Sequence, residues 1–319
     1  MMESLVALLT TNSSLLALWG ALLLHWVLPI PYPLHPIVIW QRLALLIAER
    51  VNHPKENPSQ RILAGSLAWF LMSGTVLILL FAFSQLVWYQ TIFQMTLLWM
   101  AIDWQTSAKL GKQFNQAYNL EHKGRCRELL ADHVNRNTEN LSLLGLGKAG
   151  AETLLLGYGR NVIGVLFWYA IGGGIAAIMY RLAISLARSW SPSREQFRFF
   201  GLPAIRIALI LDIVPLRLFA LLITLGQNAK NAFHGLMQQG ENWPLPGPGW
   251  LLAATGHKLS LSLGGPAMYN QVKMERPRIG GKIAPASLHL AQIQQLMTSR
   301  LWCWIIIESG LLITFHGLA

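Results

Sequence analysis

The residues best suited to chemistry lie in a basic, glycine-rich stretch near the C-terminus. Residues 250–281 read WLLAATGHKLSLSLGGPAMYNQVKMERPRIGG. The glycines and prolines predict tight turns, where backbone amides can approach a ligand closely. Basic side chains surround these turns: Lys273, Arg276, Arg278 and Lys282. Such donors suit a phosphate or a carboxylate, so the stretch predicts an anion-binding loop, with an inner-leaflet lipid headgroup as the alternative anion.

Glu152 is the carboxylate that the sequence places nearest to such an anion. It lies eight residues before Arg160, on one side of a predicted helix that leads into an apolar segment. Lys148 lies one helical turn earlier, so the three charged side chains can meet at the membrane surface. A solvated helix end is the alternative interpretation of this group.

Asp212 is a second candidate because it lies within an apolar segment. Ionisable side chains at membrane depth are costly and face a polar cavity or a partner of opposite charge. Arg206 and Arg217 lie six and five residues away, and Arg181 lies in the preceding apolar segment. A structural ion pair and a functional role both fit this pattern. Glu308, in the last apolar segment, raises the same question.

Two further motifs are less specific. Residues 145–150 match G-x-G-x-x-G, a fingerprint that needs a preceding strand to bind a dinucleotide, and no such strand is predicted. We therefore expect a flexible loop before a helix that starts near Glu152, with Lys148 and backbone amides available to a phosphate. His35 follows the first apolar segment, and we expect it to make a structural hydrogen bond or to contact a ligand.

Composition and charge indicate which elements position these residues. The chain of 319 residues is 53% hydrophobic and only 12% charged, with a mean hydropathy of +0.41. Nineteen of its 25 Lys and Arg residues fall in three stretches, 42–61, 109–160 and 230–300, between long apolar runs. Cytoplasmic loops of membrane proteins retain Lys and Arg in this way. The pattern predicts a membrane protein and argues against nucleic acid as the partner of the net charge of +11.

Six apolar segments approach the length that a helix needs to cross the bilayer. They are Leu15–Ile30, Ile62–Val87, Thr91–Ile102, Val162–Ala187, Ala204–Leu225 and Leu301–Phe315. The predicted fold is all-α: one polytopic integral membrane domain over residues 1–319, with about six transmembrane helices. An outside N-terminus places segments 31–61, 105–160 and 227–300 in the cytoplasm and Arg188–Pro203 outside.

The cytoplasmic segments are predicted to be helical as well. Charged and apolar residues alternate at helical spacing over Glu121–His133 and over Leu288–Arg300. Residues Asn242–Trp250 read NWPLPGPGW, which predicts a linker. The two cysteines, Cys126 and Cys303, fall in segments of different character, so no disulfide is expected.

The glycine-rich stretch resembles the C-terminal signature of the CbiB/CobD family, the membrane-bound adenosylcobinamide-phosphate synthases of cobalamin biosynthesis. The matching residues are Trp250, Ala253-Ala254, Leu263-Gly264-Gly265, Tyr269 and Arg276-Pro277-Arg278-Ile279-Gly280. His35-Pro36 with Trp40 is similar to the family's N-terminal HPV-x-W, and Val214–Leu218 is similar to its LPARL. The family's carboxylate motifs should fall near 156–160, 184–187 and 208–209, where this chain has no Asp or Glu. Residues 209–218 are closer to AmpE, a related membrane protein linked to β-lactamase regulation.

The resemblance implies an enzyme of the bacterial inner membrane that joins a corrinoid carboxylate to aminopropanol phosphate as an amide, using ATP and Mg²⁺. It implies catalytic carboxylates at Glu152 and Asp212, and no metal ligand is assigned. The residues implied in substrate binding are His35, Lys148, Arg160, Arg217, Gly264, Gly265, Tyr269, Arg276 and Arg278.

Two other hypotheses remain open at this point. One is a catalytically inactive, AmpE-like membrane protein that binds an anionic ligand for signalling or scaffolding. The other is a transporter, although the inverted halves of many transporters are not visible in the sequence. In each case the expected partners are the lipid bilayer and a phosphorylated or carboxylated small molecule, and an oligomer is compatible with the pattern.

Overall fold

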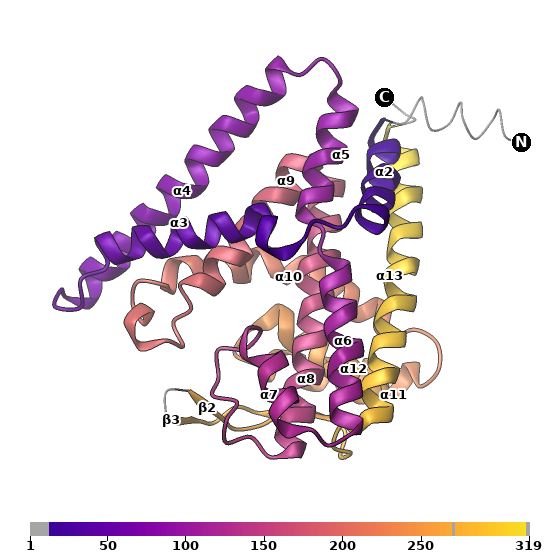
Figure 1. Cartoon of the computed structure of the whole chain (residues 1–319). Coiled ribbons are helices and arrows are strands. Elements are labelled where there is room, and N and C mark those ends of the chain that lie inside the picture. Colours follow the sequence, from indigo (N-terminus) through magenta and orange to yellow (C-terminus); the bar gives the residue numbers. More distant parts are fainter. Residues whose placement is uncertain (1–12, 270–271, 317–319) are drawn as a thin grey trace, which may run out of the picture.

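The computed structural model describes residues 13–269 and 272–316, and helices dominate it (Figure 1). The α-helices are α2 (Ser13–Val27), α3 (Pro36–Val51), α4 (Pro58–Leu86), α5 (Gln90–Ala101), α6 (Trp104–Asn119), α7 (Lys123–Ala131), α8 (Leu143–Tyr158), α9 (Gly164–Ser189), α10 (Leu202–Thr224), α11 (Ala229–Gln239), α12 (Pro246–Lys258) and α13 (Ser287–His316). Shorter helical turns are η1 (Tyr32–Leu34), the π-helical η2 (Gly159–Ile163), η3 (Glu195–Phe197) and η4 (Gly240–Asn242). Four three-residue strands complete the described elements: β1 (Ser262–Gly264), β2 (Ala267–Tyr269), β3 (Val272–Met274) and β4 (Arg278–Gly280).

Four of the described helical runs are long and apolar enough to cross a membrane. They are Pro58–Leu86, Leu143–Ser189, Leu202–Thr224 and Ser287–Thr314, and α2 is a shorter apolar helix. Only 17% of the most apolar stretch of α4 is buried inside the protein. Large apolar side chains of this helix, such as Phe70 and Ile78, are exposed. A helix that is apolar on every side is stable only inside a protein core or in lipid. The predicted all-α, polytopic membrane fold is therefore confirmed.

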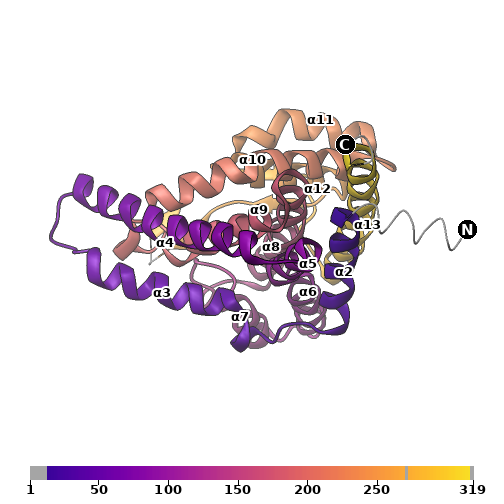
Figure 2. The ribbon, with the colours of Figure 1, turned by 90° about the horizontal axis from the view of Figure 1, so that it is seen from above.

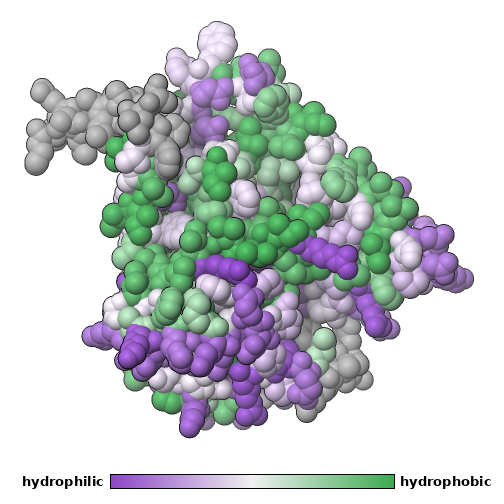
Figure 3. Space-filling view, turned by 180° about the vertical axis from the view of Figure 1, so that it is seen from behind, coloured by the Kyte–Doolittle hydropathy of each residue, from purple (hydrophilic) through white to green (hydrophobic). Residues whose placement is uncertain are grey.

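The apolar and polar parts of the molecule lie at opposite ends. In Figure 1, α2, α4, α5 and the C-terminal part of α13 form the upper end, while α6, α7 and the strands lie at the lower end. Figure 3 shows hydrophobic residues over much of the upper part and hydrophilic residues gathered below. Seen from above, α3 and α4 extend to one side of the bundle formed by α6, α8, α9 and α13 (Figure 2). This division fits a bilayer around the upper end and water around the lower end.

Two short hairpins depart from the all-helical expectation and carry the predicted anion loop. Strands β1 and β4 pair antiparallel, with Leu263 opposite Ile279, and both side chains are buried. Strands β2 and β3 pair antiparallel, with Met268 opposite Lys273. These strands are too short for a two-residue alternation to mark them in the sequence.

Most predicted apolar segments coincide with helices, but the fourth one differs. Predicted over Val162–Ala187, it is part of a longer run that begins with α8 and continues through η2 into α9. Helical geometry is lost at Gly172 and Gly173, the second of which has a φ of +66°. Gln94 of α5 accepts a hydrogen bond from the Gly174 amide, which would otherwise lack a partner at this break.

Beyond the glycine break, α9 runs along α3. The indole of Trp40 donates to the Leu182 carbonyl at 3.1 Å. The indole of Trp190 donates to the Ala44 carbonyl at 2.9 Å. The end of α9 is thus fixed beside a helix that belongs to the predicted cytoplasmic segment 31–61.

These contacts correct the predicted side of the loop Arg188–Pro203. The Gln196 carbonyl accepts hydrogen bonds from Asn52 Nδ2 at 2.7 Å and from Arg61 Nη2 at 2.5 Å. Asn135 Nδ2 donates to Ser191 Oγ at 2.9 Å. The three side chains belong to segments predicted to be cytoplasmic: Asn52, Arg61 and Asn135. The loop therefore lies on the same side as those segments, and the prediction that placed it on the side opposite to them is wrong. The break at Gly172–Gly173 is the physical reason, because the helix does not continue straight.

Two smaller predictions are also wrong. Residues 145–150 form part of α8, which begins at Leu143 after the Ser142 side chain accepts from the Gly145 amide at 3.2 Å. These glycines permit close packing: a Cβ at Gly147 would lie 2.6 Å from Tyr118 Oη. The proposed linker 242–250 is helical from Pro246 onward, because proline is tolerated in the first turn of a helix.

The predicted amphipathic segments are helical with shifted bounds. The segment Glu121–His133 contains α7, which spans Lys123–Ala131. The segment Leu288–Arg300 is continuous with the last apolar segment in α13, which begins at Ser287.

Candidate functional site

Glu152 lies at the centre of the site that the glycine-rich loop forms. Its side chain, 8% exposed, extends from α8. Its Oε1 accepts a hydrogen bond from the Gly264 amide at 3.0 Å. Its Oε2 lies 3.2 Å from Arg136 Nη2 and 3.4 Å from Arg276 Nη1. The loop site consists of this carboxylate and the groups around it: Arg136, Lys148, Glu152, Gly264 and Arg276.

The loop backbone fixes the position of Arg276. Gly264 and Gly265 have φ values of +70° and +93°, a region that favours glycine. The Gly265 amide donates to the Pro277 carbonyl at 3.0 Å, and the Gly265 carbonyl accepts from Arg276 Nε at 3.0 Å. A Cβ at Gly264 would lie 2.5 Å from the Pro277 carbonyl oxygen and 2.7 Å from the Trp243 ring. The glycine pair is therefore required for the guanidinium to reach Glu152.

Two cationic groups of the loop site keep capacity for a further anion. The Arg276 guanidinium lies over the Trp243 ring at 4.9 Å, and its Nη2 is buried without a hydrogen-bond partner among the described residues. An unpaired buried donor costs about 1–3 kcal/mol, which an incoming oxygen would recover. Lys148 Nζ donates to the neutral hydroxyl of Ser262 at 3.1 Å.

The loop site carries donors of the kinds that suit an anion. One carboxylate is shared between two guanidinium groups, and the ammonium of Lys148 has a neutral partner. Guanidinium and ammonium groups with a directed backbone amide are the donors that bind phosphate oxygens in proteins. Arg278, the first residue of β4, is exposed and lies two residues after Arg276, at the edge of this group.

Asp212 forms a second cluster with Arg160 and Tyr180. Its fully buried carboxylate accepts from Arg160 Nε at 2.7 Å through Oδ2 and from Tyr180 Oη at 2.8 Å through Oδ1. Arg160 comes from η2, and π-helical turns of this kind are frequent at functional sites. Its Nη2 is buried and, within the described chain, has no hydrogen-bond partner. The partner that the structure gives Asp212 is Arg160. Of the partners considered from sequence, Arg181 pairs with Asp103 and Arg217 pairs with Glu241.

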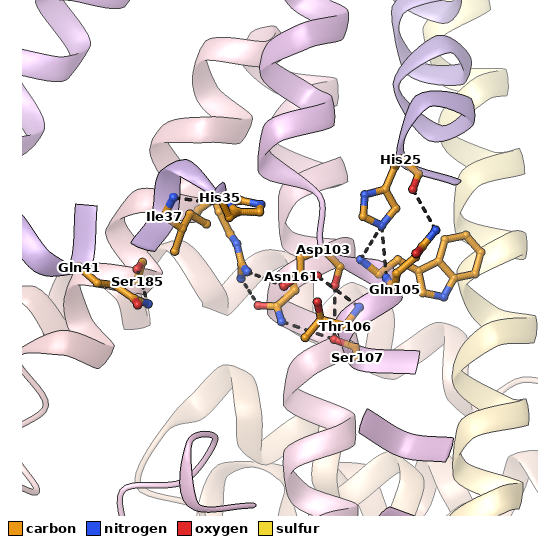
Figure 4. Close-up of polar contacts among 12 residues, drawn as sticks. His25, His35, Ile37, Gln41, Asp103, Gln105, Thr106, Ser107, Asn161 and Ser185 are labelled. Atoms are coloured by element: carbon orange, nitrogen blue, oxygen red, sulfur yellow. Dashed lines mark hydrogen bonds and ion pairs between the residues drawn. The ribbon is translucent and has the colours of Figure 1, made fainter. Parts of the chain in front are cut away.

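A third polar cluster lies where α2 ends and where α5 gives way to α6 (Figure 4). Arg181 pairs with Asp103 at 3.2 Å and also donates to the Asn161 side chain. His25 Nε2 accepts from the Trp104 and Gln105 amides, each at 3.2 Å. A cavity of about 20 Å³, the size of one water molecule, is lined in part by His25, His35 and Asp103.

His35 belongs to this third cluster and caps α3. Its Nδ1 accepts from the Ile37 amide at 3.3 Å. Burial is the main cause that lowers its pKa to about 4, and the nearby positive charge of Arg181 adds to this effect. The imidazole is thus neutral at pH 7, and the structure shows it making the structural hydrogen bond that was one of the two expectations.

The remaining predicted residues lie in other surroundings. Arg217 pairs with Glu241 at 2.5 Å and lies over the Trp250 ring at 4.8 Å. The backbone of Tyr269 ends strand β2, beside the segment that contains Arg136, because the Asn137 amide donates to the Met268 carbonyl at 3.1 Å. Lys258, which was not among the predicted residues, donates to three carbonyls at and just after the end of α10, and these bonds explain its burial.

The structure therefore brings together only part of the predicted set. Six predicted residues gather at the loop: Lys148, Glu152, Gly264, Gly265, Arg276 and Arg278. The others lie in three separate places, with Arg160 and Asp212 paired in one, His35 in the second and Arg217 in the third. Sequence reasoning missed Arg136, Tyr180 and Asp103. Asp103 carried a signal, because a single acidic residue directly after an apolar run is a common helix N-cap, and it does cap α6. Arg136 and Tyr180 carried none that distinguishes them from their neighbours.

The carboxylates in these clusters do not fit a Mg²⁺ ion. Mg²⁺ binds carboxylate oxygens and water in octahedral geometry. Glu152, Asp212 and Asp103 each pair with at least one arginine, and a guanidinium in contact with the carboxylate repels a second cation. The same arginines fit phosphate oxygens well.

Comparison with known proteins gives one consistent relationship. Residues 18–298 match the family model of the CobD/Cbib protein. The chain is 28% identical to the cobalamin biosynthesis protein CobD of Stutzerimonas stutzeri over 92% of this chain and 97% of that protein. It is 29% identical to the CobD of Chromobacterium violaceum over 89% and 92% of the two chains. The CobD of Clostridium tetani is 23% identical over 82% and 86%. No solved structure gives a significant match.

The matched range contains both the loop site and the Asp212 cluster, and it covers nearly all of the described membrane domain. The resemblance in the glycine-rich stretch thus extends along the chain. The protein belongs to the CobD/CbiB family of cobalamin biosynthesis proteins.

Proposed function

We propose that this protein carries out the amide-forming step in which a corrinoid carboxylate is joined to aminopropanol phosphate. The loop site is proposed to bind the phosphate group of the amine substrate. The observation that carries the proposal is the geometry around Arg276: a buried guanidinium with one unpaired nitrogen, next to Arg136, Lys148 and the Gly264 amide. Family membership and the names of the relatives support cobalamin biosynthesis as the setting.

The position of the loop site suits a soluble phosphorylated substrate. The hairpins and the lower part of α8 lie at the polar end of the molecule, away from the apolar end (Figures 1 and 3). Many of the Lys and Arg residues also lie in segments at that end, and such segments stay in the cytoplasm. The substrate phosphate and ATP are both available there.

The chain's own residues supply binding and orientation in this proposal. Condensation of a carboxylate with an amine forms a C–N bond and releases the equivalent of water, and ATP hydrolysis would drive it. Holding the phosphate between Arg136, Arg276 and Lys148 anchors one end of the aminopropanol, so that its amine is presented in a restricted volume. Such anchoring lowers the barrier because the reacting groups no longer have to find each other.

A complementation experiment tests the proposal. The gene is expressed in a strain that lacks its adenosylcobinamide-phosphate synthase, under conditions where growth requires cobalamin. Growth is expected for the wild type, and Arg276→Gln is expected to abolish or strongly slow it. Arg125→Gln, which alters an exposed arginine on α7, is the matched control and should support growth.

The level of protein in the membrane is measured for every strain. Wild-type protein that accumulates in the membrane without restoring growth would contradict the amide-forming role. In that case, phosphate binding that persists in the purified protein would point instead to an AmpE-like protein that binds an anion for signalling or scaffolding.

A further inference from the structure

We infer that Glu152 is an internal anion that occupies the loop site until a phosphate displaces it. This inference rests on the proposed phosphate site and adds a form of regulation to it. The site is then never empty of negative charge: it exchanges a tethered carboxylate for a bound phosphate group.

The contacts of Glu152 are those that a phosphate would make. The carboxylate takes one backbone amide, from Gly264, and two guanidinium nitrogens, from Arg136 and Arg276. These donors come from two separate parts of the chain, the segment before α8 and the glycine-rich hairpin, and they converge on one acidic side chain. Phosphate oxygens are recognised in proteins by the same combination of arginines and amides. Glu152 and a phosphate therefore compete for the same donors.

The two arginine contacts of Glu152 are long for charge-assisted hydrogen bonds. They measure 3.2 and 3.4 Å, against a usual range of about 2.7–2.9 Å for such bonds. Arg276 also keeps Nη2 unpaired in the described structure, although the atom is buried. A carboxylate has two oxygens and cannot reach every donor present, whereas a phosphate group has three terminal oxygens. The donor set thus matches the larger anion better than the one that now occupies it.

A displaced Glu152 has a cation to receive it. Lys148 lies four residues earlier, on the same face of α8, where Lys and Glu side chains can pair. Within the described chain, the ammonium group of Lys148 donates a hydrogen bond to the Ser262 hydroxyl, which is neutral. Rotation of the Glu152 side chain is the movement required, because α8 itself is held by the close packing of Gly147 against Tyr118.

Phosphate binding to the full-length protein in detergent tests the inference. The affinity for inorganic phosphate is measured by isothermal titration calorimetry for wild type, Glu152→Gln, Glu152→Asp, Arg276→Gln and the control Glu128→Gln. Glu152→Gln removes the competing charge and keeps the side-chain shape, so phosphate should bind about tenfold more tightly. Glu152→Asp, whose shorter carboxylate reaches the arginines less well, should give a smaller increase. Glu128→Gln removes the same charge from an exposed position on α7 and should bind as the wild type does.

Stability supplies a second readout, because two buried arginines without Glu152 repel each other. Glu152→Gln should be less heat-stable than the wild type in phosphate-free buffer, and added phosphate should restore its stability. Unchanged or weaker phosphate binding by both Glu152 variants, with no rescue by phosphate, would overturn the inference.

The two proposals fail in different ways. If the wild type binds phosphate and Arg276→Gln does not, but removal of Glu152 gives no gain, the phosphate site stands and the internal anion is wrong. If neither the wild type nor Glu152→Gln binds phosphate, the loop is not a phosphate site and both this inference and the assignment of substrate binding to the loop are wrong.

Discussion

Arg160 and Asp212 form a buried ion pair across two helices, with 2.7 Å between Nε and Oδ2, although 52 residues separate them in sequence. Asp212 is completely buried and Arg160 is 20% exposed. The Tyr180 hydroxyl completes the pair from α9. Arg160 and its neighbour Asn161 thus face Tyr180 and its neighbour Arg181. The π-helical turn η2 thus supplies Arg160 to Asp212 on α10 and Asn161 to Arg181 on α9.

The first prediction concerns the strength of this pair. Asp212→Asn leaves a buried guanidinium uncompensated, and breaking a buried pair in this way costs about 3–5 kcal/mol. The apparent melting temperature in detergent should therefore fall markedly. The double variant Arg160→Met/Asp212→Asn should recover part of the loss, because no buried charge remains unpaired.

The exposed pair of Arg217 and Glu241 provides the comparison for this prediction. Glu241 is 58% exposed, so Glu241→Gln should cost at most about 1 kcal/mol. Equal losses for Glu241→Gln and Asp212→Asn would mean that burial does not strengthen the Asp212 pair. A double variant less stable than Asp212→Asn alone would also contradict the interpretation.

The membrane helices could be predicted because their signal is local. Length and hydropathy alone mark α4 and α10, and the observed bounds differ from the predicted ones by only a few residues. The bend in α9 could not be placed in the same way. Its three consecutive glycines were visible, but the loss of helical geometry depends on Gln94, which lies 80 residues earlier. The side of the following loop was mispredicted for this reason.

The candidate site was predictable only where its residues are close in sequence. Gly264, Gly265 and Arg276 lie within one hairpin, so glycine and arginine chemistry pointed to them directly. The partner of Asp212 was sought on its own helix and on the preceding span, whereas it comes from a π-helical turn. Helical spacing cannot predict such a turn, because the extra residue shifts the face on which the following side chains lie.

A second prediction concerns pH and His35. The pKa of His35 in the folded protein is lowered to about 4 from 6.5, chiefly by burial and then by Arg181, while Asp103 acts in the opposite direction. Between pH 6.5 and 4 the unfolded chain binds a proton that the folded chain does not. The contribution of His35 to stability is thus fully present above pH 6.5 and is lost as the pH falls toward 4.

The variant His35→Asn isolates this effect. Asparagine can still accept the Ile37 amide at the start of α3, but it does not titrate. Melting temperatures measured from pH 7.5 to 4.5 should fall less steeply for the variant than for the wild type. Parallel curves for the two proteins would show that the protonation of His35 does not oppose folding.

A third prediction concerns the loop backbone. Gly264→Ala places a Cβ at a φ of +70° and against the Pro277 carbonyl oxygen, at 2.5 Å. The left-handed conformation alone costs about 1–2 kcal/mol for a residue with a side chain, and the contact adds to it. Phosphate affinity should fall severalfold, because the amide that Gly264 directs at the site is displaced. Gly74→Ala on α4 has open space around the new Cβ and should leave phosphate affinity unchanged.

The last prediction concerns the side of the membrane on which residues 190–200 lie. The hydrogen bonds of the Gln196 carbonyl to Asn52 and Arg61 require this loop to share a side with the α3–α4 connection. In a background with Cys126→Ala and Cys303→Ala, single variants Glu195→Cys and Lys55→Cys should react with a membrane-impermeant thiol reagent from the same side. Trp88→Cys, in the exposed α4–α5 connection, should react from the opposite side, because α4 is long enough to cross the bilayer. Labelling of Glu195→Cys together with Trp88→Cys would instead support a straight α9 and restore the outside loop. Arg194 and Arg198 lie in this loop, and Arg188 lies in the last turn of α9 beside it. Reaction of Glu195→Cys from the cytoplasmic side would therefore agree with the retention of positive charge in the cytoplasm.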